Sequence, residues 1–252
     1  MFDYTPYEGA PKTAAEAKLQ FVLANRILAN EGVLDGYGHV SIRNPENNQT
    51  LFQARAVSPE FVQLSDILEM DLDGNVLNNT EHKPYGERVI HACVLKARPD
   101  VNAVYHGHSQ EVVALSTLGI PFRSMAQFCG MFYEPLPYFD DYREGSGMLL
   151  TTLEDGQKLA GALGEAKGII MRGHGYTMTG TSTQQMVMNA IFLRDNTRMQ
   201  LMALPLGEPK YISEEEGRGT EKTQYSAISL GRCWDYWLHR AEKAMPDLSE
   251  IT

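Results

Sequence analysis

Two short apolar runs that end in histidines constrain the fold of this chain more than any other feature. Val101–Tyr105 has the character of a strand and is followed by His-Gly-His at positions 106–108. Because side chains alternate in direction along a strand, His106 and His108 point to the same side. A second apolar run, Gly168–Met171, is followed by Arg-Gly-His-Gly, which places His174 between two glycines. The fold must bring two strand ends together if the three imidazoles are to bind one divalent ion.

A metalloenzyme is the first hypothesis from this pattern. Three protein ligands leave open positions on the ion, as catalytic metal sites require. Glu87 is the best candidate for an anionic oxygen, because it lies in Pro-Tyr-Gly-Glu-Arg-Val-Ile-His at the first turn of a helix expected over 85–96. The helix dipole favours a carboxylate at that position. Such a carboxylate could bind the ion or act as a base.

Composition excludes several other classes of protein. The chain has 252 residues, of which 43% are hydrophobic, and this is ordinary for a globular protein. The net charge is −10 and basic clusters are absent, so a nucleic-acid surface is not expected. No apolar run approaches the roughly 20 residues of a membrane helix. The N-terminus lacks the regions of a signal peptide, and the three cysteines have no disulfide spacing, so we expect a cytoplasmic protein.

The apolar pattern predicts a single domain over 1–252 in which helices and short strands are mixed. An irregular N-terminal arm is expected over 1–11 and an acidic loop over 207–219. Helices are expected over 13–31, 85–96, 109–117, 153–163, 183–204 and 225–243. Strands are expected within 36–43 and over 51–56, 67–71, 101–106, 131–138 and 168–171. Without a regular βαβ repeat, the fold class is α/β with a mixed or antiparallel central sheet flanked by helices.

Three segments together resemble the class II aldolase/adducin family. They are Glu87, the stretch Ala97-Arg-Pro-Asp-Val-Asn-Ala-Val-Tyr-His-Gly-His108, and Arg172-Gly-His-Gly175. The resemblance runs from about residue 13 to residue 205 in the family's order. It implies a single α/β/α domain around a largely antiparallel sheet, and a homotetramer with the metal site near a subunit boundary. It also implies that His106, His108 and His174 bind one Zn²⁺ or Mn²⁺ per chain, with Glu87 as fourth ligand or acid/base.

Departures from the family's sugar-phosphate aldolases bear on the substrate. Those enzymes carry Gly-Asn-Val-Ser where this chain has Gly38-His-Val-Ser41, and Ser-Ser where it has Tyr85-Gly86. The tyrosine that acts as general acid in fuculose-phosphate aldolase would align near Met125, which cannot donate a proton. The chain is more similar to the branch that holds hydroxypyridine and dihydroxyphthalate decarboxylases.

The resemblance implies a carbon–carbon lyase that works through a metal-stabilised enolate. The first expectation is a decarboxylase of a hydroxylated aromatic or oxo acid, in which Glu87 or His39 protonates the carbon. The small-molecule substrate would be anionic and would need a cationic clamp. The candidates for binding it are Arg172, Arg123, Gly38 and Tyr85.

Three alternatives stay open. The first is an aldolase that acts on a non-phosphorylated hydroxy-ketone or hydroxy acid. The second is a dehydratase or epimerase, since both use the same metal-bound enolate. The third is a non-enzymatic scaffold like the head domain of adducin, against which the complete set of ligands argues.

Overall fold

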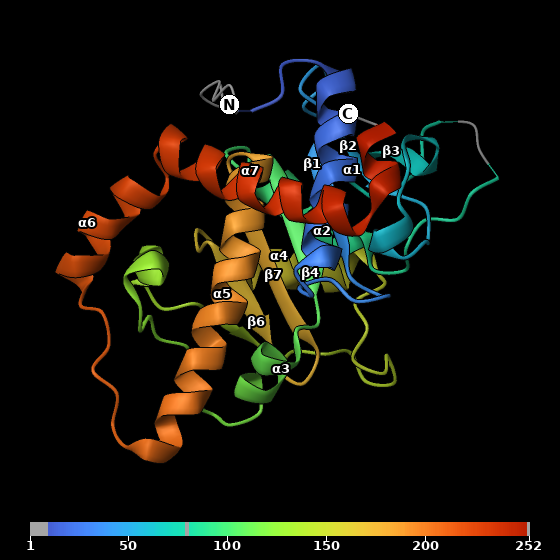
Figure 1. The fold of residues 1–252 in the computed structure, drawn as a ribbon. Coiled ribbons are helices and arrows are strands. Elements are labelled where there is room, and N and C mark those ends of the chain that lie inside the picture. The colour runs from blue at the N-terminus through green and yellow to red at the C-terminus, as the bar shows by residue number, and fades with distance from the viewer. Residues whose placement is uncertain (1–9, 79–80, 251–252) are drawn as a thin grey trace, which may run out of the picture.

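A seven-stranded sheet forms the centre of the fold (Figure 1). The computed structural model describes residues 10–78 and 81–250. The strands are β1 (His39–Arg43), β2 (Thr50–Ala54), β3 (Ile67–Asp71), β4 (Ala103–Gly107), β5 (Tyr138–Phe139), β6 (Gly168–Met171) and β7 (Gly175–Gly180). Their order is β3-β2-β1-β4-β7-β6-β5, and the neighbours are antiparallel except for β5 and β6. The strand that carries His106 therefore lies in the middle of the sheet.

Helices cover both faces of the sheet. The α-helices are α1 (Ala14–Asn30), α2 (Arg88–Ala97), α3 (Gln110–Ser116), α4 (Leu153–Leu163), α5 (Thr183–Ala203), α6 (Glu214–Gln224) and α7 (Ala227–Ala244). Short 3₁₀ helices are η1 (Pro59–Phe61), η2 (Leu64–Asp66), η3 (Gln127–Phe132), η4 (Leu204–Leu206) and η5 (Pro246–Glu250). One hydrophobic cluster joins the sheet to α1, α3, α5 and α7, and a second joins it to α2 and α4. The expected α/β/α architecture with a largely antiparallel sheet is confirmed.

Alternation along β4 decides on which side of the sheet the first histidine lies. Tyr105 belongs to the cluster with α1 and α5, whereas Val104 belongs to the cluster with α2 and α4. Because successive side chains point to opposite faces, His106 follows Val104 onto the α2 side. Its side chain is fully buried. The first imidazole thus faces α2, which starts directly after Glu87.

Local signals in the sequence account for several elements. Thr13 caps α1 through a capping box with Glu16, as the expected helix start requires. The strand at 67–71, the helix at 153–163 and the strand at 168–171 have the predicted bounds. Of the arm expected over 1–11, residues 1–9 lie outside the described part of the chain.

Three expectations about local structure are wrong. The segment 131–138 is not a strand, since η3 occupies its start and only Tyr138 begins a strand, at the sheet edge. The loop expected over 207–219 gives way at Glu214 to α6, which Ser213 caps through a capping box with Glu216. The sequence pattern missed β7, whose terminal glycines are depleted in strands although its tyrosine and two threonines favour them, and pairing between β4 and β6 makes it a strand.

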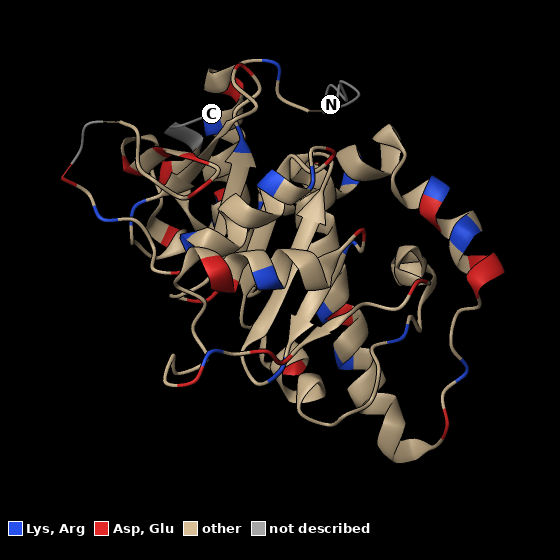
Figure 2. Cartoon of the chain, turned by 180° about the vertical axis from the view of Figure 1, so that it is seen from behind, with Lys and Arg blue, Asp and Glu red and all other residues tan. Residues whose placement is uncertain are grey.

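Residues of both charges are interspersed along the chain, as the view from behind shows (Figure 2). Lysine, arginine, aspartate and glutamate alternate along α6 and are interspersed elsewhere on this side. Among the described helices, none is long and apolar enough to cross a membrane.

Candidate metal centre

The ends of β4 and β7 bring the three histidines together. In the sheet, His106 pairs with Thr177 of β7 on one side and with His39 of β1 on the other. β6 and β7 are joined by a tight turn in which the backbone amide of His174 donates to the carbonyl of Met171 at 3.1 Å. The turn needs a residue with positive φ, and glycine at position 173 (φ 64°) supplies it. His174 therefore returns to the sheet end at which β4 finishes.

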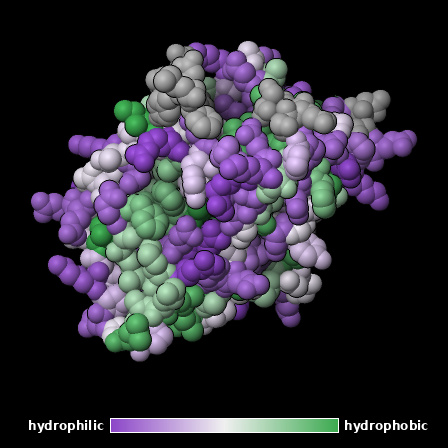
Figure 3. Space-filling view, viewed as in Figure 1, coloured by the Kyte–Doolittle hydropathy of each residue, from purple (hydrophilic) through white to green (hydrophobic). Residues whose placement is uncertain are grey.

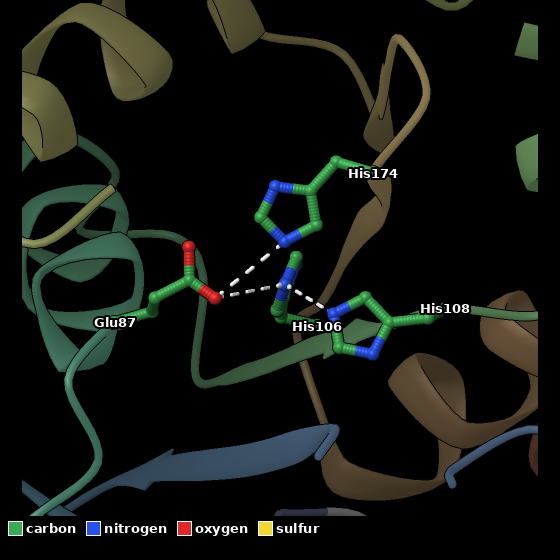
Figure 4. A group of neighbouring side chains, drawn as sticks. All are labelled: Glu87, His106, His108 and His174. Atoms are coloured by element: carbon green, nitrogen blue, oxygen red, sulfur yellow. Dashed lines mark hydrogen bonds and ion pairs between the residues drawn. The ribbon is translucent and has the colours of Figure 1, made fainter. Parts of the chain in front are cut away.

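Glu87, His106, His108 and His174 each place one ligand atom within 4.8 Å of the others (Figure 4). The Glu87 Oε2 atom is 3.5 Å from His174 Nε2 and 3.8 Å from His106 Nε2. The Nε2 atoms of His106 and His108 are 3.2 Å apart. Three imidazole nitrogens and one carboxylate oxygen form a donor set that suits Zn²⁺ or Mn²⁺.

In His108 and His174, the hydrogen bonds made by Nδ1 show that Nε2, which faces the cluster, is available to an ion. His108 Nδ1 lies 3.3 Å from Asp35 Oδ1, and His174 Nδ1 lies 3.0 Å from the carbonyl oxygen of Met148. Both partners can only accept, so each Nδ1 carries the proton and each Nε2 presents a lone pair. This hydrogen bond from His108 lowers the pKa of Asp35 well below its usual value. Lone pairs that converge in this way repel one another unless a cation lies between them, and the residues therefore fit a divalent ion.

The hydroxyl of Thr177 is the corresponding partner of His106, with its Oγ1 at 3.2 Å from Nδ1. Burial lowers the pKa of His106 well below 6.5, and the neighbouring imidazoles lower it further, so this ring is neutral. Residues such as Thr177, Asp35 and Met148 were missed in the sequence because no short-range pattern links them to the histidines.

Replacing Thr177 with valine is expected to weaken metal binding by about 10–100-fold while the fold persists, because an oriented ligand loses its outer partner. The dissociation constant for Zn²⁺ measured against a chelating indicator tests this. Thr179→Val is the matched control: that hydroxyl, two residues along β7, bonds to the carbonyl of Lys167 instead. Unchanged affinity in Thr177→Val would contradict the orienting role.

Glu87 is the N-cap residue of α2, which begins at Arg88 and not at residue 85 as expected, so Glu87 precedes the first turn of the helix and does not lie in it. The side chain is largely buried, and its Oε1 atom accepts a hydrogen bond of 2.8 Å from the backbone amide of Leu150. That bond fixes the carboxylate and leaves Oε2 facing the histidines (Figure 4). The segment that contains Met148 and Leu150 thus holds two of the four clustered side chains by its backbone.

Close contact between β4 and β7 depends on glycine at position 175. A Cβ atom there would lie 2.3 Å from the Gly107 carbonyl oxygen and 3.0 Å from His108 Cδ2. We expect Gly175→Ala to force the strands apart, to lower the free energy of unfolding by about 1–3 kcal/mol, and to weaken metal binding. Chemical denaturation and metal titration measure the two effects. Gly161→Ala in α4, where a Cβ meets open space, is the control and should not lower stability.

His39 lies at the start of β1, beside the cluster. Its Nδ1 is 2.7 Å from Nε2 of His91, and the Nδ1 of His91 is 2.7 Å from the hydroxyl oxygen of Ser41. Burial lowers the pKa of both rings, that of His91 to about 3. The sequence offered no reason to link these three residues, since they meet only when α2 packs on β1.

An open cleft of about 410 Å³ leads to the cluster. Its walls are formed by Asp35, Tyr37, His39, Tyr85, Gly86, Glu87, His108, Leu149, Thr151 and His174. The ring of Tyr85 lies 4.7 Å from that of His39, while its hydroxyl donates to the carbonyl of Val57. Burial raises the pKa of Tyr85 to about 12, so this side chain offers the cleft a ring and no acid.

The other candidates for substrate binding, Arg172, Arg123 and Gly38, are not among the residues that line this cleft. Arg172 forms an ion pair of 2.6 Å with Asp140, and its side chain is half exposed. Arg123 lies over the ring of Tyr211, and its backbone bonds to Asn196 and Gln200. The backbone amide of Gly38 donates to Asp35 Oδ1, and this position therefore supports the carboxylate that holds His108.

Comparisons with known proteins agree with this geometry. The sequence model of the family "Class II Aldolase and Adducin N-terminal domain" matches residues 20–201. A 3,4-dihydroxyphthalate decarboxylase of Arthrobacter keyseri is 32% identical over 198 residues, which cover 72% of this chain and 76% of that protein. Decarboxylase tropJ of Talaromyces stipitatus is 29% identical over 249 residues, covering 88% and 92%. The solved structure of L-fuculose 1-phosphate aldolase from Glaciozyma antarctica PI12 has a TM-score of 0.79 at 26% identity, covering 93% and 91%.

Proposed function

This chain belongs to the class II aldolase and adducin family, and we propose that it is a divalent-metal-dependent carbon–carbon lyase that decarboxylates a hydroxylated aromatic or oxo acid. The observation that carries this proposal is the convergence of three imidazole nitrogens and one carboxylate oxygen at the base of an open cleft. His106, His108, His174 and Glu87 would hold Zn²⁺ or Mn²⁺, which supplies a Lewis acid that polarises a substrate oxygen.

The lining of the cleft favours a planar substrate. No lysine or arginine is found among the described residues that line it, whereas Asp35 and Glu87 are both there. A phosphate and a carboxylate substrate would both meet these two carboxylates without a cationic side chain from the lining, so charge does not distinguish the two kinds of acid. The rings of Tyr37 and Tyr85 instead offer flat apolar surfaces to a planar substrate.

Glu87 is the residue proposed to move a proton. Its Oε1 is held by the amide of Leu150, and its Oε2 faces the position where the ligand atoms converge. A carboxyl group fixed there can protonate the carbon from which CO₂ has left, or hold the ion as its fourth ligand.

The test is a substrate screen with purified protein reconstituted with Zn²⁺ or Mn²⁺. We expect CO₂ release from hydroxylated aromatic acids, with 3,4-dihydroxyphthalate as the first compound because a relative is named for it. The likeness to a fuculose phosphate aldolase favours aldolase activity as the second candidate, so hydroxy-ketones and L-fuculose 1-phosphate are screened for aldehyde release. Release of an aldehyde without release of CO₂ would show that the protein is an aldolase and would overturn the decarboxylase proposal.

A homotetramer is the proposed assembly. Hydrophobic side chains gather on part of the surface in Figure 3, and Met202 and Leu206, at the end of α5 and in η4, are 67% and 89% exposed. Such exposure is typical of surfaces that a partner covers. Light scattering is expected to give about four times the 28.2 kDa of one chain, and a monomer would contradict this proposal.

A further inference from the structure

The cleft contains a feature that the proposed function leaves unexplained: a buried hydrogen-bonded chain that ends at its wall. Ser41, His91 and His39 are each at most 3% exposed. The chain runs from the Ser41 hydroxyl to His91 Nδ1, and from His91 Nε2 to His39 Nδ1, with both distances 2.7 Å. His39 borders the cleft, and its Nε2 is the one ring nitrogen left for a ligand there.

The hydroxyl end of the chain sets the direction of its hydrogen bonds. Among the described residues, His91 Nδ1 is the partner seen for the Ser41 hydroxyl, and a buried hydroxyl that does not donate is costly. Ser41 therefore donates to His91 Nδ1. A neutral imidazole carries one proton, so His91 donates from Nε2 to His39 Nδ1. The proton of His39 then sits on Nε2.

We propose that Ser41 and His91 are positioning residues that hold His39 as a neutral hydrogen-bond donor, and that His39 Nε2–H binds a carboxylate or carbonyl oxygen of the substrate. This inference rests on the proposed function only for the acidic class of substrate. It explains how a cleft whose described lining has two carboxylates and no cationic side chain can bind an acid. A neutral donor stabilises an anionic oxygen without adding a second positive charge beside a metal ion.

The opposite arrangement is well defined and can be detected. The backbone of Val104, the ladder partner of Ser41, also faces His91 and acts to raise the pKa of that ring, although burial lowers it more. If His91 used an Nδ1–H to reach the carbonyl of Val104, its Nε2 would accept and His39 Nε2 would be a bare lone pair. The ¹⁵N shifts of the imidazole nitrogens in the Zn²⁺-loaded protein separate the two cases. A protonated Nε2 on His39 is expected, and a protonated Nδ1 on His39 would overturn the proposal.

Binding of 3,4-dihydroxybenzoate to the Zn²⁺-loaded protein, followed by calorimetry, tests the donor role without turnover. His39→Phe should weaken binding about tenfold or more, the factor expected for a hydrogen bond to a charged group. His39→Asn, whose amide keeps a donor, should lie closer to the parent protein. Equal affinity in all three proteins would refute the role of His39.

The positioning role of Ser41 is tested by rescue. Ser41→Ala removes the hydroxyl that directs the chain, and it should weaken binding of the same probe about tenfold although Ser41 does not line the cleft. Ser41→Thr keeps a hydroxyl and should restore affinity, whereas a merely structural role would not distinguish them in folded, Zn²⁺-loaded protein. If the parent protein releases no CO₂ from any acid but shows this pattern, the decarboxylase proposal fails and the donor stands. If the parent protein releases CO₂ but the variants do not differ in affinity in this way, the decarboxylase proposal stands and the donor role of His39 fails.

Discussion

Replacing His106 with alanine is expected to abolish metal binding and turnover together. His106 occupies the centre of the cluster, since its Nε2 lies 3.2 Å from His108 Nε2 and 3.8 Å from Glu87 Oε2. Loss of a partner in the outer shell already weakens metal binding by about 10–100-fold, so loss of a ligand should exceed that range. Without a polarising ion, a lyase of this kind has no means to accept the electron pair of the broken bond.

The measurement is elemental analysis of purified protein, with turnover assayed on the same samples. One Zn²⁺ or Mn²⁺ per chain is expected in the parent protein and none in His106→Ala. His239→Ala, on the exposed surface of α7, is the control for loss of a histidine and should keep both metal and activity. Circular dichroism shows whether the variant is folded, because the Thr177 hydroxyl loses its contact with the imidazole and keeps the weaker one with Met171 Sδ, at a cost of about 1 kcal/mol. Full metal content in folded His106→Ala would make the histidine cluster structural.

Part of the candidate site could be predicted because its geometry is local. His106 and His108 share a face through the two-residue period of a strand, and this relation holds in any fold that keeps the strand. The position of His174 could be predicted on the single condition that a second strand ends at the same end of the sheet. β7 was not expected, but the predicted position of His174 did not depend on it. The turn after Met171 already returns the chain to β4.

The rest of the site depends on contacts that no sequence period encodes. His91 lies one turn after Glu87 on α2 and meets Ser41 of β1 only because that helix packs over that strand. The carbonyl of Met148 contacts His174 through a backbone conformation, φ 67°, which side-chain types do not foretell. Side-chain identity at 148 therefore carries no signal for a role that its backbone performs.

The charge expected of the substrate did not identify the residues that line the cleft. An acidic substrate suggested a guanidinium clamp, but Arg172 neighbours His174 in sequence and pairs with Asp140 in the structure. Arg172 and His174 are two residues apart, but both lie in the turn after β6, where the alternation of a strand does not hold, so proximity in sequence does not place the two side chains in one cleft. The direction of the hydrogen bond proposed at His39 depends on contacts between two separate elements, β1 and α2, and could not be inferred before they are placed together.

Glu87→Gln is expected to reduce turnover by about 10²–10⁴-fold, the usual contribution of a positioned acid or base. The substitution is nearly isosteric, and the amide oxygen can still accept the 2.8 Å hydrogen bond from Leu150. The fold and the cleft should therefore be retained. What is lost is the negative charge that faces His106 and His174 and the capacity to exchange a proton at Oε2.

Metal affinity separates the two roles open to this carboxylate. If Glu87 is a ligand, Glu87→Gln should bind Zn²⁺ more weakly, and saturating metal should restore part of the activity. If it acts only as acid and base, affinity should hold while kcat falls at every metal concentration. Glu154→Gln, whose exposed side chain makes a surface pair with Lys158, is the matched control, because such pairs contribute little. Parental kcat in metal-saturated Glu87→Gln would remove Glu87 from the chemistry and leave His39 as the candidate proton donor.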